Sequence, residues 1–336
     1  MQVPPLAPAA HAFREDLIER AVEAAANAAE RHLLTLAGTS LTLDFGTTEL
    51  AQALLPALSH HVVAGSPLQD LKPALQPAGV RLIVWSDPLP PFPWGGQHLG
   101  RGGAITGLSD GPVRAVATTD DSSLVLWDEH RQLACCWFAA PSSVTRWDRA
   151  APLRVALHFA LTQAHRHLVH GAVVGQGGRG VLLAGPGGSG KSTTTLACLD
   201  AGLDVVGDDY AVVDLRDEAP RAWNLYRSLK VGERRADRDD RRTLLLGADR
   251  PQQATMYLDL VAILLPRVTG GARSTLQPAS RAAALRALAP STLMQAPYEE
   301  RPTLGALTAL AQALPAWELG LGEDRGVGAI TEVLAA

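Results

Sequence analysis

The chain has 336 residues, of which 47% are hydrophobic and 19% are charged, and its formal net charge is −4. This length exceeds one average domain core, so we expect two domains, residues 1–150 and residues 151–336. The apolar fraction excludes wholesale disorder, and the nearly balanced charge gives no overall field that would attract nucleic acid or an anionic membrane.

The cysteine content and the N-terminal residues favour the cytoplasm. Three cysteines, two of them adjacent at Cys135 and Cys136, fit neither a disulfide framework nor a metal-ligand spacing, which indicates a reducing compartment and small core residues. Prolines interrupt the apolar residues at 1–10 and no basic residue is present there, so we expect no signal peptide. No stretch reaches the ~18 apolar residues that span a bilayer. A cytoplasmic protein follows.

The first domain is expected to combine one helix with short strands. Apolar and alanine positions recur at helical spacing over residues 11–36, which predicts one amphipathic helix. Short apolar runs separated by glycine and proline then predict a mostly β or mixed domain. These runs are 41–43, 80–85, 113–117 and 123–127. Residues 88–103 are rich in proline and glycine and are expected to form an ordered surface loop.

The second domain is expected to have an α/β fold. A helical pattern over 152–168 precedes the order strand, glycine-rich turn, helix, strand, which is typical of an α/β unit with parallel strands. Further strands are predicted around 211–215 and 256–265, and helices around 280–288, 302–314 and 327–334. We therefore expect a parallel-rich phosphate-loop domain beside an N-terminal domain made of a helix and mixed β-structure.

A phosphate-binding motif lies at residues 185–192. The buried strand 180–184 leads into Gly-Pro-Gly-Gly-Ser-Gly-Lys-Ser, and a helix follows over 193–200, which is GxxxxGK[ST] in its strand–loop–helix setting. Glycines let successive N–H groups point inward, and the helix N-terminus adds partial positive charge. Lys191 is expected to reach the β- and γ-phosphates of ATP, and Ser192 to ligate the Mg²⁺ between them. The residues expected to hold the nucleotide are Gly185, Gly187, Gly188, Ser189, Gly190, Lys191, Ser192 and Thr193.

Two adjacent carboxylates follow the next buried strand. Residues 203–206 end in Gly207, Asp208 and Asp209, at the edge of an α/β sheet where ligands bind. One carboxylate can hold Mg²⁺ while the other accepts the proton of a hydroxyl that is phosphorylated. The alternatives are structural: turn carboxylates here, and a mere connecting turn at the glycine-rich loop.

These segments resemble the HPr kinase/phosphorylase family, whose catalytic domain has a histidine, a phosphate loop and an aspartate pair in this order. His170-Gly171, residues 180–192 and residues 207–209 carry the resemblance, which covers about residues 168–214. Residues 225–231 (LYRSLKV) and 289–295 (APSTLMQ) look like segments of HPr kinase-related proteins in bacterial peptide-modification clusters, among them kinases of lasso peptide precursors.

The resemblance implies a fold, a reaction and three residue roles. The fold is a P-loop catalytic domain of the HPr kinase type, and the reaction transfers the γ-phosphate of ATP to a serine hydroxyl. Asp208 is implied as the general base, Asp209 as a Mg²⁺ ligand, and His170 as a neighbour that orients or electrostatically tunes the aspartate. Thr193 stands where HPr kinases carry an acidic residue, which counts against HPr as the substrate and against phosphorolysis.

The histidines also have plainer interpretations. His170 can be a satisfied histidine at the start of a strand. His165, His167 and His170 lack a carboxylate or cysteine that would complete a zinc site. Ser291 and Thr292 are expected to cap a helix rather than touch substrate.

Arg227 and Lys230 are candidates for contact with the substrate. They can neutralise charge on the transferred phosphoryl group or hold a substrate carboxylate. The alternatives are a solvated charged face or loop for the arginine-rich residues 216–250, and a lysine stem that covers apolar surface.

We expect an ATP- and Mg²⁺-dependent serine kinase that acts on a peptide or small protein, such as a ribosomally made precursor of the lasso peptide type. The first domain would recruit the substrate or serve a structural role. A kinase of a small molecule such as free serine, and an ATP-binding regulatory protein without catalysis, are the alternatives. The sequence leaves the oligomeric state open, a homo-oligomer included, and indicates neither nucleic acid nor a membrane as a partner.

Overall fold

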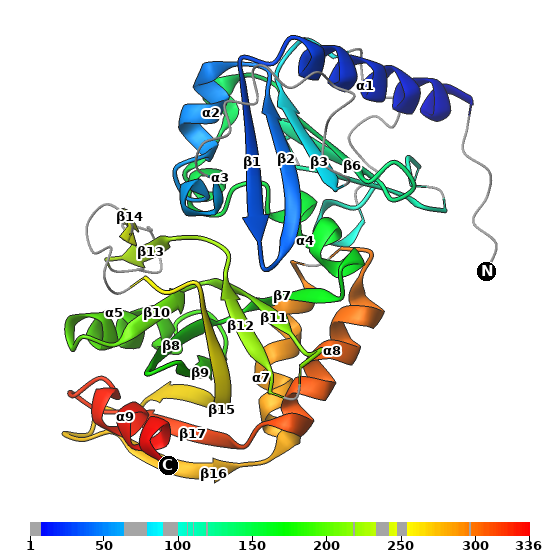
Figure 1. The fold of residues 1–336 in the computed structure, drawn as a ribbon. Helices are drawn as coiled ribbons and strands as arrows, with labels where there is room; N and C mark the ends of the chain where they lie inside the picture. The colour runs from blue at the N-terminus through cyan, green and yellow to red at the C-terminus, as the bar shows by residue number, and fades with distance from the viewer. Residues whose placement is uncertain are drawn as a thin grey trace. The chain divides into compact units, whose positions relative to one another are not determined.

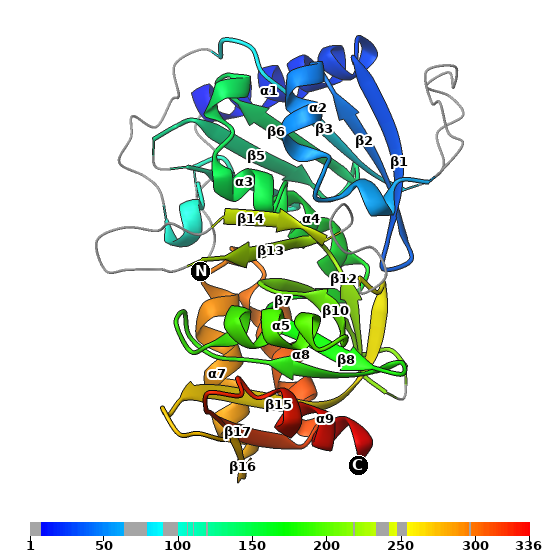
Figure 2. The ribbon, with the colours of Figure 1, turned by 90° about the vertical axis from the view of Figure 1, so that its left-hand side faces the viewer.

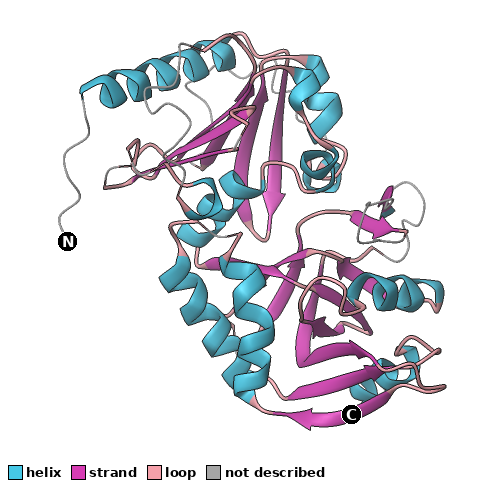
Figure 3. Ribbon diagram, turned by 180° about the vertical axis from the view of Figure 1, so that it is seen from behind, coloured by secondary structure: helices cyan, strands magenta, loops and turns pink. Residues whose placement is uncertain are grey.

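A computed structural model of the chain shows two compact units, one made of residues 1–164 and 295–299 and the other of residues 165–294 and 300–336. The structure describes residues 8–63, 79–89, 100–105, 107–109, 111–118, 120–217, 219–232, 242–246, 254–295 and 297–336. Much of the expected loop at 88–103 and of the arginine-rich run at 216–250 lies outside the described residues. Helices flank β-strands in each unit, so the fold is mixed α/β, as predicted (Figure 3).

The first unit is built on a six-stranded mixed sheet in the order β1-β2-β3-β6-β5-β4. Its strands are β1 (Glu30–Leu36), β2 (Thr39–Phe45), β3 (Val80–Trp85), β4 (Val113–Ala117), β5 (Ser123–Asp128) and β6 (Leu133–Phe138). The pairs β2–β3 and β3–β6 are parallel, and the other neighbours are antiparallel. All four strands predicted for this part of the chain are confirmed.

The helix predicted over residues 11–36 is wrong in its second half. Helix α1 (Pro8–Ala26) ends at Ala26, and β1 then pairs antiparallel with β2. The chain reverses at Ala37 and Gly38, whose φ angles are 48° and 74°, as two-residue hairpin turns require. Pairing with β2 therefore overrides the helical spacing of the local sequence.

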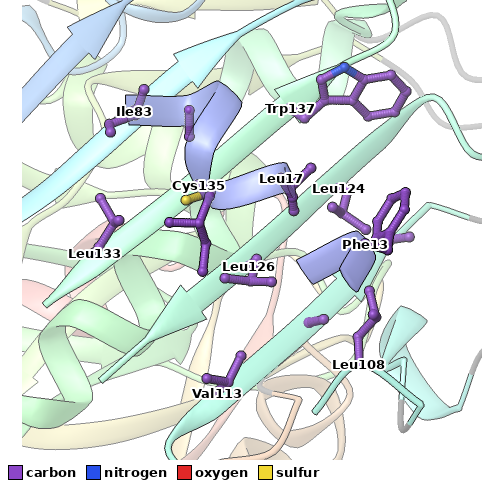
Figure 4. Close-up of a cluster of buried hydrophobic side chains, with 14 of the residues drawn as sticks. Phe13, Leu17, Ile83, Leu108, Val113, Leu124, Leu126, Leu133, Cys135 and Trp137 are labelled. Carbon is purple, nitrogen blue, oxygen red and sulfur yellow. The ribbon is translucent and has the colours of Figure 1, made fainter. Parts of the chain in front are cut away.

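Helix α1 covers one face of this sheet (Figure 4). Phe13 and Leu17 of α1 belong to one buried cluster with Leu126, Cys135 and Trp137 from the strands. A spacing of four residues keeps the helix side chains on one stripe that faces the sheet. The burial of Cys135 confirms the prediction that it is a core residue.

Three further helices belong to the first unit. They are α2 (Thr48–Leu54), α3 (Arg146–Ala150) and α4 (Arg154–Gln163). Phe159 of α4 stacks on Trp127 of β5, with ring centroids 6.4 Å apart. Because Trp127 and Leu126 are consecutive strand residues and point to opposite faces, α4 packs on the face of the sheet that α1 leaves free. The helix predicted over 152–168 ends at Gln163, and a left-handed His165 (φ 56°) precedes the next strand.

The second unit contains a nine-stranded mixed sheet. Its main path is β10-β8-β9-β15-β12-β11-β7, with β17 beside β15 and β16 beside β17. The strands are β7 (Arg166–His170), β8 (Ala172–Gln176), β9 (Arg179–Leu183), β10 (Asp204–Gly207), β11 (Tyr210–Asp214), β12 (Arg221–Asn224), β15 (Tyr257–Val268), β16 (Thr275–Ala279) and β17 (Ala316–Leu321). A separate two-stranded ribbon consists of β13 (Ser228–Val231) and β14 (Arg242–Leu245).

The expectation of a parallel-rich sheet is wrong. Among the described strands of this sheet, β9–β15 and β15–β17 pair parallel and the other pairs are antiparallel. Strand β8 lies between β9 and β10 and is antiparallel to both. Strands β9 and β10 consequently run in the same direction and end at the same edge of the sheet.

Helices cover both faces of the second sheet (Figure 1). Helices α5 (Lys191–Asp200) and α9 (Val327–Ala335) pack on one face, in a cluster with Leu183 and Leu264. Helices α7 (Arg281–Leu293) and α8 (Glu300–Ala313) pack on the other face, in a cluster with Leu182 and Ile263. The four helices predicted for these segments are confirmed. In the described part of the chain, no helix has both the length and the apolar character needed to cross a membrane.

Candidate active site

The phosphate loop connects the end of β9 to the start of α5. The amide of Ala184 donates a hydrogen bond to Leu264 O (2.9 Å), which fixes the start of the loop on β15. Gly188 and Gly190 have φ angles of 87° and 107°, a region that glycine enters without steric cost. The first N–H groups of an α-helix have no intrahelical acceptor, so the start of α5 offers donors to an anion.

Lys191 is buried inside this loop, with 6% of its surface exposed. Its Nζ donates hydrogen bonds to Gly185 O (2.7 Å) and Pro186 O (3.1 Å). Burial lowers the pKa of Lys191, while attraction to Asp209 and Asp208 acts in the opposite direction. The loop therefore holds a cation through carbonyl oxygens that phosphate oxygens can replace.

Gly190→Ala is expected to lower the melting temperature by several °C. An added Cβ would lie 2.4 Å from Leu321 Cδ1, in addition to the strain of the positive φ. Together these effects cost about 2–4 kcal/mol. Gly188→Ala is the matched control, because its φ is also positive but no described atom lies within 4 Å of the added Cβ. Thermal unfolding followed by circular dichroism should show the larger loss for Gly190→Ala, and equal losses would exclude the clash.

The aspartate pair follows β10, at the sheet edge where β9 ends. The side chain of Asp208 is buried, with 2% of the residue exposed, and its Oδ2 accepts a hydrogen bond from the Lys230 amide (3.2 Å). No described residue donates a hydrogen bond of normal geometry to Asp208 Oδ1. Asp209 is less buried, and its carboxylate forms an ion pair with the Lys230 ammonium.

Burial raises the pKa of Asp208 to about 7, with repulsion from Asp209 as the second cause. Hydrogen bonds from the Lys230 amide and the Ser192 hydroxyl lower this pKa, as does the charge of Lys230. Since β9 and β10 end at the same edge of the sheet, the aspartate pair lies at the edge where the phosphate loop begins. A carboxylate with a pKa near the working pH is suited to accept a proton in catalysis.

The same burial is expected to make the folded state less stable as pH rises. The folded pKa of Asp208, about 7, lies above the ordinary value of 3.8, so the penalty is absent below about pH 4 and develops between these two values. Asp208→Asn should raise the melting temperature by roughly 3–8 °C at pH 8 and by less than about 1 °C at pH 4. Thermal unfolding at both pH values measures the difference, and an equal gain at both would show that it does not come from this ionisation.

His170 lies next to the aspartate pair through the backbone. The amide of Gly171 donates a hydrogen bond to Asp209 O (3.1 Å). The His170 ring contacts Tyr210 edge to face, with centroids 5.6 Å apart. The structure thus brings the histidine to the site, and its influence on the Asp208 carboxylate stays a prediction.

Two residues of this region were not predicted as parts of it. Asn224, which is 1% exposed, donates a side-chain hydrogen bond to Val206 O and so holds the strand that leads to Asp208. Thr292 accepts a hydrogen bond from the His170 amide (3.1 Å). The expectation that Thr292 and Ser291 cap a helix is wrong, since both lie inside α7. These partners are 18 and 122 residues apart in sequence, so no local pattern could indicate them.

The two substrate candidates differ in position. Lys230 of β13 contacts both aspartates. Arg227 precedes β13 and its carbonyl accepts a hydrogen bond from the Leu246 amide (2.8 Å). Burial lowers the pKa of Arg227, and among the described residues no hydrogen bond or ion pair joins its guanidinium to the aspartates. The structure therefore brings Lys230, and not Arg227, into contact with the pair.

The oxygen donors of this site fit Mg²⁺. The Ser192 hydroxyl and the Asp209 carboxylate would hold Mg²⁺ through hard oxygen donors, and the buried Asp208 Oδ1, to which no described residue donates a hydrogen bond of normal geometry, is a further oxygen on the residue next to Asp209 in sequence. In the described ranges, no group of three or more histidine, cysteine, aspartate or glutamate residues could hold a metal ion by itself.

This arrangement defines a P-loop protein with a buried acidic pair beside the loop. The chain is 41% identical over 73 residues to the HPr kinase/phosphorylase of Lactobacillus delbrueckii subsp. bulgaricus. The match covers 20% of this chain, and the chain spans only 23% of that relative's length. It confirms the predicted resemblance to the HPr kinase/phosphorylase family over this segment. The matched relative is not described as a lasso peptide kinase, so a lasso-type substrate stays a prediction.

Two further comparisons complete this result. No protein-family model matches the chain. The solved structure of the HPr(Ser) kinase/phosphatase from Coxiella burnetii aligns with 50% of this chain and 94% of its own, at 9% identity and a TM-score of 0.32.

Proposed function

We propose that the protein is an ATP- and Mg²⁺-dependent kinase that phosphorylates a serine hydroxyl on a peptide or small protein. One observation supports the proposal: the Asp208 carboxylate is buried at the sheet edge where β9 leads into the phosphate loop, and its burial raises its pKa. Phosphorylation of a hydroxyl needs a general base of this kind, whereas a protein that only binds a nucleotide does not need one.

The phosphate loop would hold the nucleotide. Backbone N–H groups at the start of α5 and the ammonium of Lys191 would bind the phosphate oxygens, with Ser192 and Asp209 as the Mg²⁺ ligands. When bound, Mg²⁺ would neutralise part of the negative charge on the β- and γ-phosphates. His170 would orient or tune the aspartates through the next residue, Gly171, whose amide donates a hydrogen bond to Asp209 O.

Asp208 would act as the general base. It accepts the proton of the serine hydroxyl while the hydroxyl oxygen forms a bond to the γ-phosphorus. The bond between that phosphorus and the β–γ bridging oxygen breaks, and ADP leaves. The burial of Asp208 supports this role, because a desolvated carboxylate with a pKa near 7 holds the proton more tightly than an exposed one.

A precursor peptide of the lasso type is the proposed substrate. The segment at 225–231, which looks like that of kinases from peptide-modification clusters, contains Lys230 and hence contacts the aspartate pair. The first unit is proposed to recruit the peptide. Free serine as the acceptor, and ATP binding without transfer, are the competing functions.

Incubation of the full chain with ATP and Mg²⁺ tests these functions together. Serine-containing precursor peptides, free serine and buffer form the three arms, and mass spectrometry detects the addition of phosphate. Phosphorylated peptide supports the proposal, and replacement of its serine by alanine should remove the signal. Phosphoserine alone would favour the small-molecule kinase, while nucleotide binding without transfer in any arm would favour a regulatory protein.

A further inference from the structure

We propose that Lys230 is a tethered cation that occupies Asp209 in the metal-free protein and leaves this carboxylate when Mg²⁺ binds. The inference rests on the proposed function, in which Asp209 is a Mg²⁺ ligand. It assigns Lys230 a place in the order of binding: the lysine keeps the acidic pair assembled until the metal and nucleotide arrive.

Lys230 contacts both members of the pair through different atoms. Its backbone amide donates a hydrogen bond to Asp208 Oδ2 (3.2 Å), and its ammonium forms an ion pair with Asp209 Oδ2. The side chains of Lys230 and Asp209 are only 18% and 21% exposed, so solvent screens this pair less than a surface ion pair. One residue thus binds the Asp208 carboxylate through its backbone amide and the Asp209 carboxylate through its charge.

Lys191 does not supply this counter-charge by direct contact. Its ammonium is engaged by two carbonyl oxygens of the phosphate loop, Gly185 O and Pro186 O. Two adjacent carboxylates repel each other, and the repulsion is one cause of the raised pKa of Asp208. The Lys230 ammonium therefore offsets a repulsion that would otherwise disfavour the ionised pair.

The same contact must oppose metal binding. The oxygen of Asp209 that accepts the ammonium, Oδ2, cannot give the same lone pair to a metal ion, and both cations seek the same negative charge. Mg²⁺ can bind Asp209 fully only when the ammonium moves away. Metal-free stability of the acidic pair and affinity for Mg²⁺ are consequently linked through one lysine.

The ribbon β13–β14 keeps Lys230 at the site after this exchange. Leu229 of β13 and Leu246, next to β14, are buried in the cluster that packs on α5, and the ribbon lies beside that helix (Figure 2). The amide of Lys230 can retain its hydrogen bond to Asp208 while the side chain rotates. The released ammonium then remains close to the phosphate loop, where it can pair with phosphate oxygens.

Titration with Mn²⁺ alone, followed by electron paramagnetic resonance of the free ion, tests the exchange without catalysis. Lys230→Gln is expected to bind Mn²⁺ about tenfold more tightly than the wild type, because the competing cation is gone. Lys230→Arg keeps a cation and should remain close to wild type. Arg301→Gln, which removes one charge from an exposed position on α8, is the matched control and should change nothing.

A double-mutant cycle assigns the effect to Asp209. In the Asp209→Asn background, Lys230→Gln should no longer strengthen Mn²⁺ binding, because the carboxylate for which the cations compete has been removed. Unchanged or weaker Mn²⁺ binding by Lys230→Gln in the wild-type background would overturn the proposal. Tighter binding that persists without the Asp209 carboxylate would do so too.

Acetylation of the wild-type chain gives a second test that needs no variant. Mass spectrometry after brief treatment with acetic anhydride measures the reactivity of Lys230, which should rise severalfold on addition of Mg²⁺ as the ammonium leaves Asp209. Unchanged or reduced reactivity contradicts the exchange.

The outcomes separate this inference from the proposed function. If the chain phosphorylates peptide while Mn²⁺ affinity ignores Lys230, the exchange is wrong and the kinase stands. If Lys230→Gln tightens Mn²⁺ binding but the protein never binds nucleotide, the exchange stands and the kinase is wrong.

Discussion

Asp208→Asn is expected to bind ATP as tightly as the wild type and to transfer phosphate roughly 10²–10⁴-fold more slowly. The amide has almost the size of the carboxyl group that it replaces, so the buried position beside the Lys230 amide remains filled. It cannot take the proton of the attacking hydroxyl. Titration with a fluorescent ATP analogue measures binding, and mass spectrometry of the peptide product measures transfer.

Asp204→Asn is the control for this substitution. Asp204 begins the strand that ends just before Asp208, so the control removes a carboxylate from the opposite end of β10. Its transfer rate should stay within about twofold of wild type, since surface and remote substitutions change little. Equal transfer by Asp208→Asn and wild type would remove Asp208 as the base. A loss of ATP binding in Asp208→Asn would place the role of this carboxylate in nucleotide binding instead.

The parts of the site that the sequence predicts are those encoded locally. The strand, the loop and α5 appear as expected, because glycine spacing and the helix start fix the backbone within one stretch of chain. The Asp208–Asp209 pair could be placed at the end of its strand for the same reason. Its position at the sheet edge where the phosphate loop begins depends in addition on β8, which sets the direction of β10 relative to β9.

The parts that could not be predicted depend on partners distant in sequence. The antiparallel insertion of β8 changes the sheet without any change in the apolar pattern of its neighbours. Residues 30–36, which follow an alanine-rich helix, also fit helical spacing until pairing with β2 is known. The contact of Lys230 with both aspartates depends on the pairing of β13 with β14. The sequence of β13 alone, a short apolar and basic segment, does not indicate this pairing. The periodicity of apolar residues indicates which side chains are buried, but it does not indicate which strands are neighbours in the sheet.

Lys191→Met is expected to weaken ATP binding by at least about 100-fold. The ammonium is the buried cation of the phosphate loop, and each charge-assisted hydrogen bond that it can make to a phosphate oxygen contributes about 1.5–3 kcal/mol. Methionine fills a similar volume and suits a position that is 6% exposed, so the loop should keep its fold. Titration with the fluorescent ATP analogue in the presence of Mg²⁺ measures the loss.

Two further variants make this result specific. Lys191→Arg should recover little affinity, because a planar guanidinium does not fit the place of an ammonium held by Gly185 O and Pro186 O. Arg301→Gln removes the same charge from an exposed position and should bind ATP normally. Normal binding by Lys191→Met would mean that the loop only connects β9 to α5. The acidic pair would then face no nucleotide, and the raised pKa of Asp208 would be a property of burial without a catalytic role.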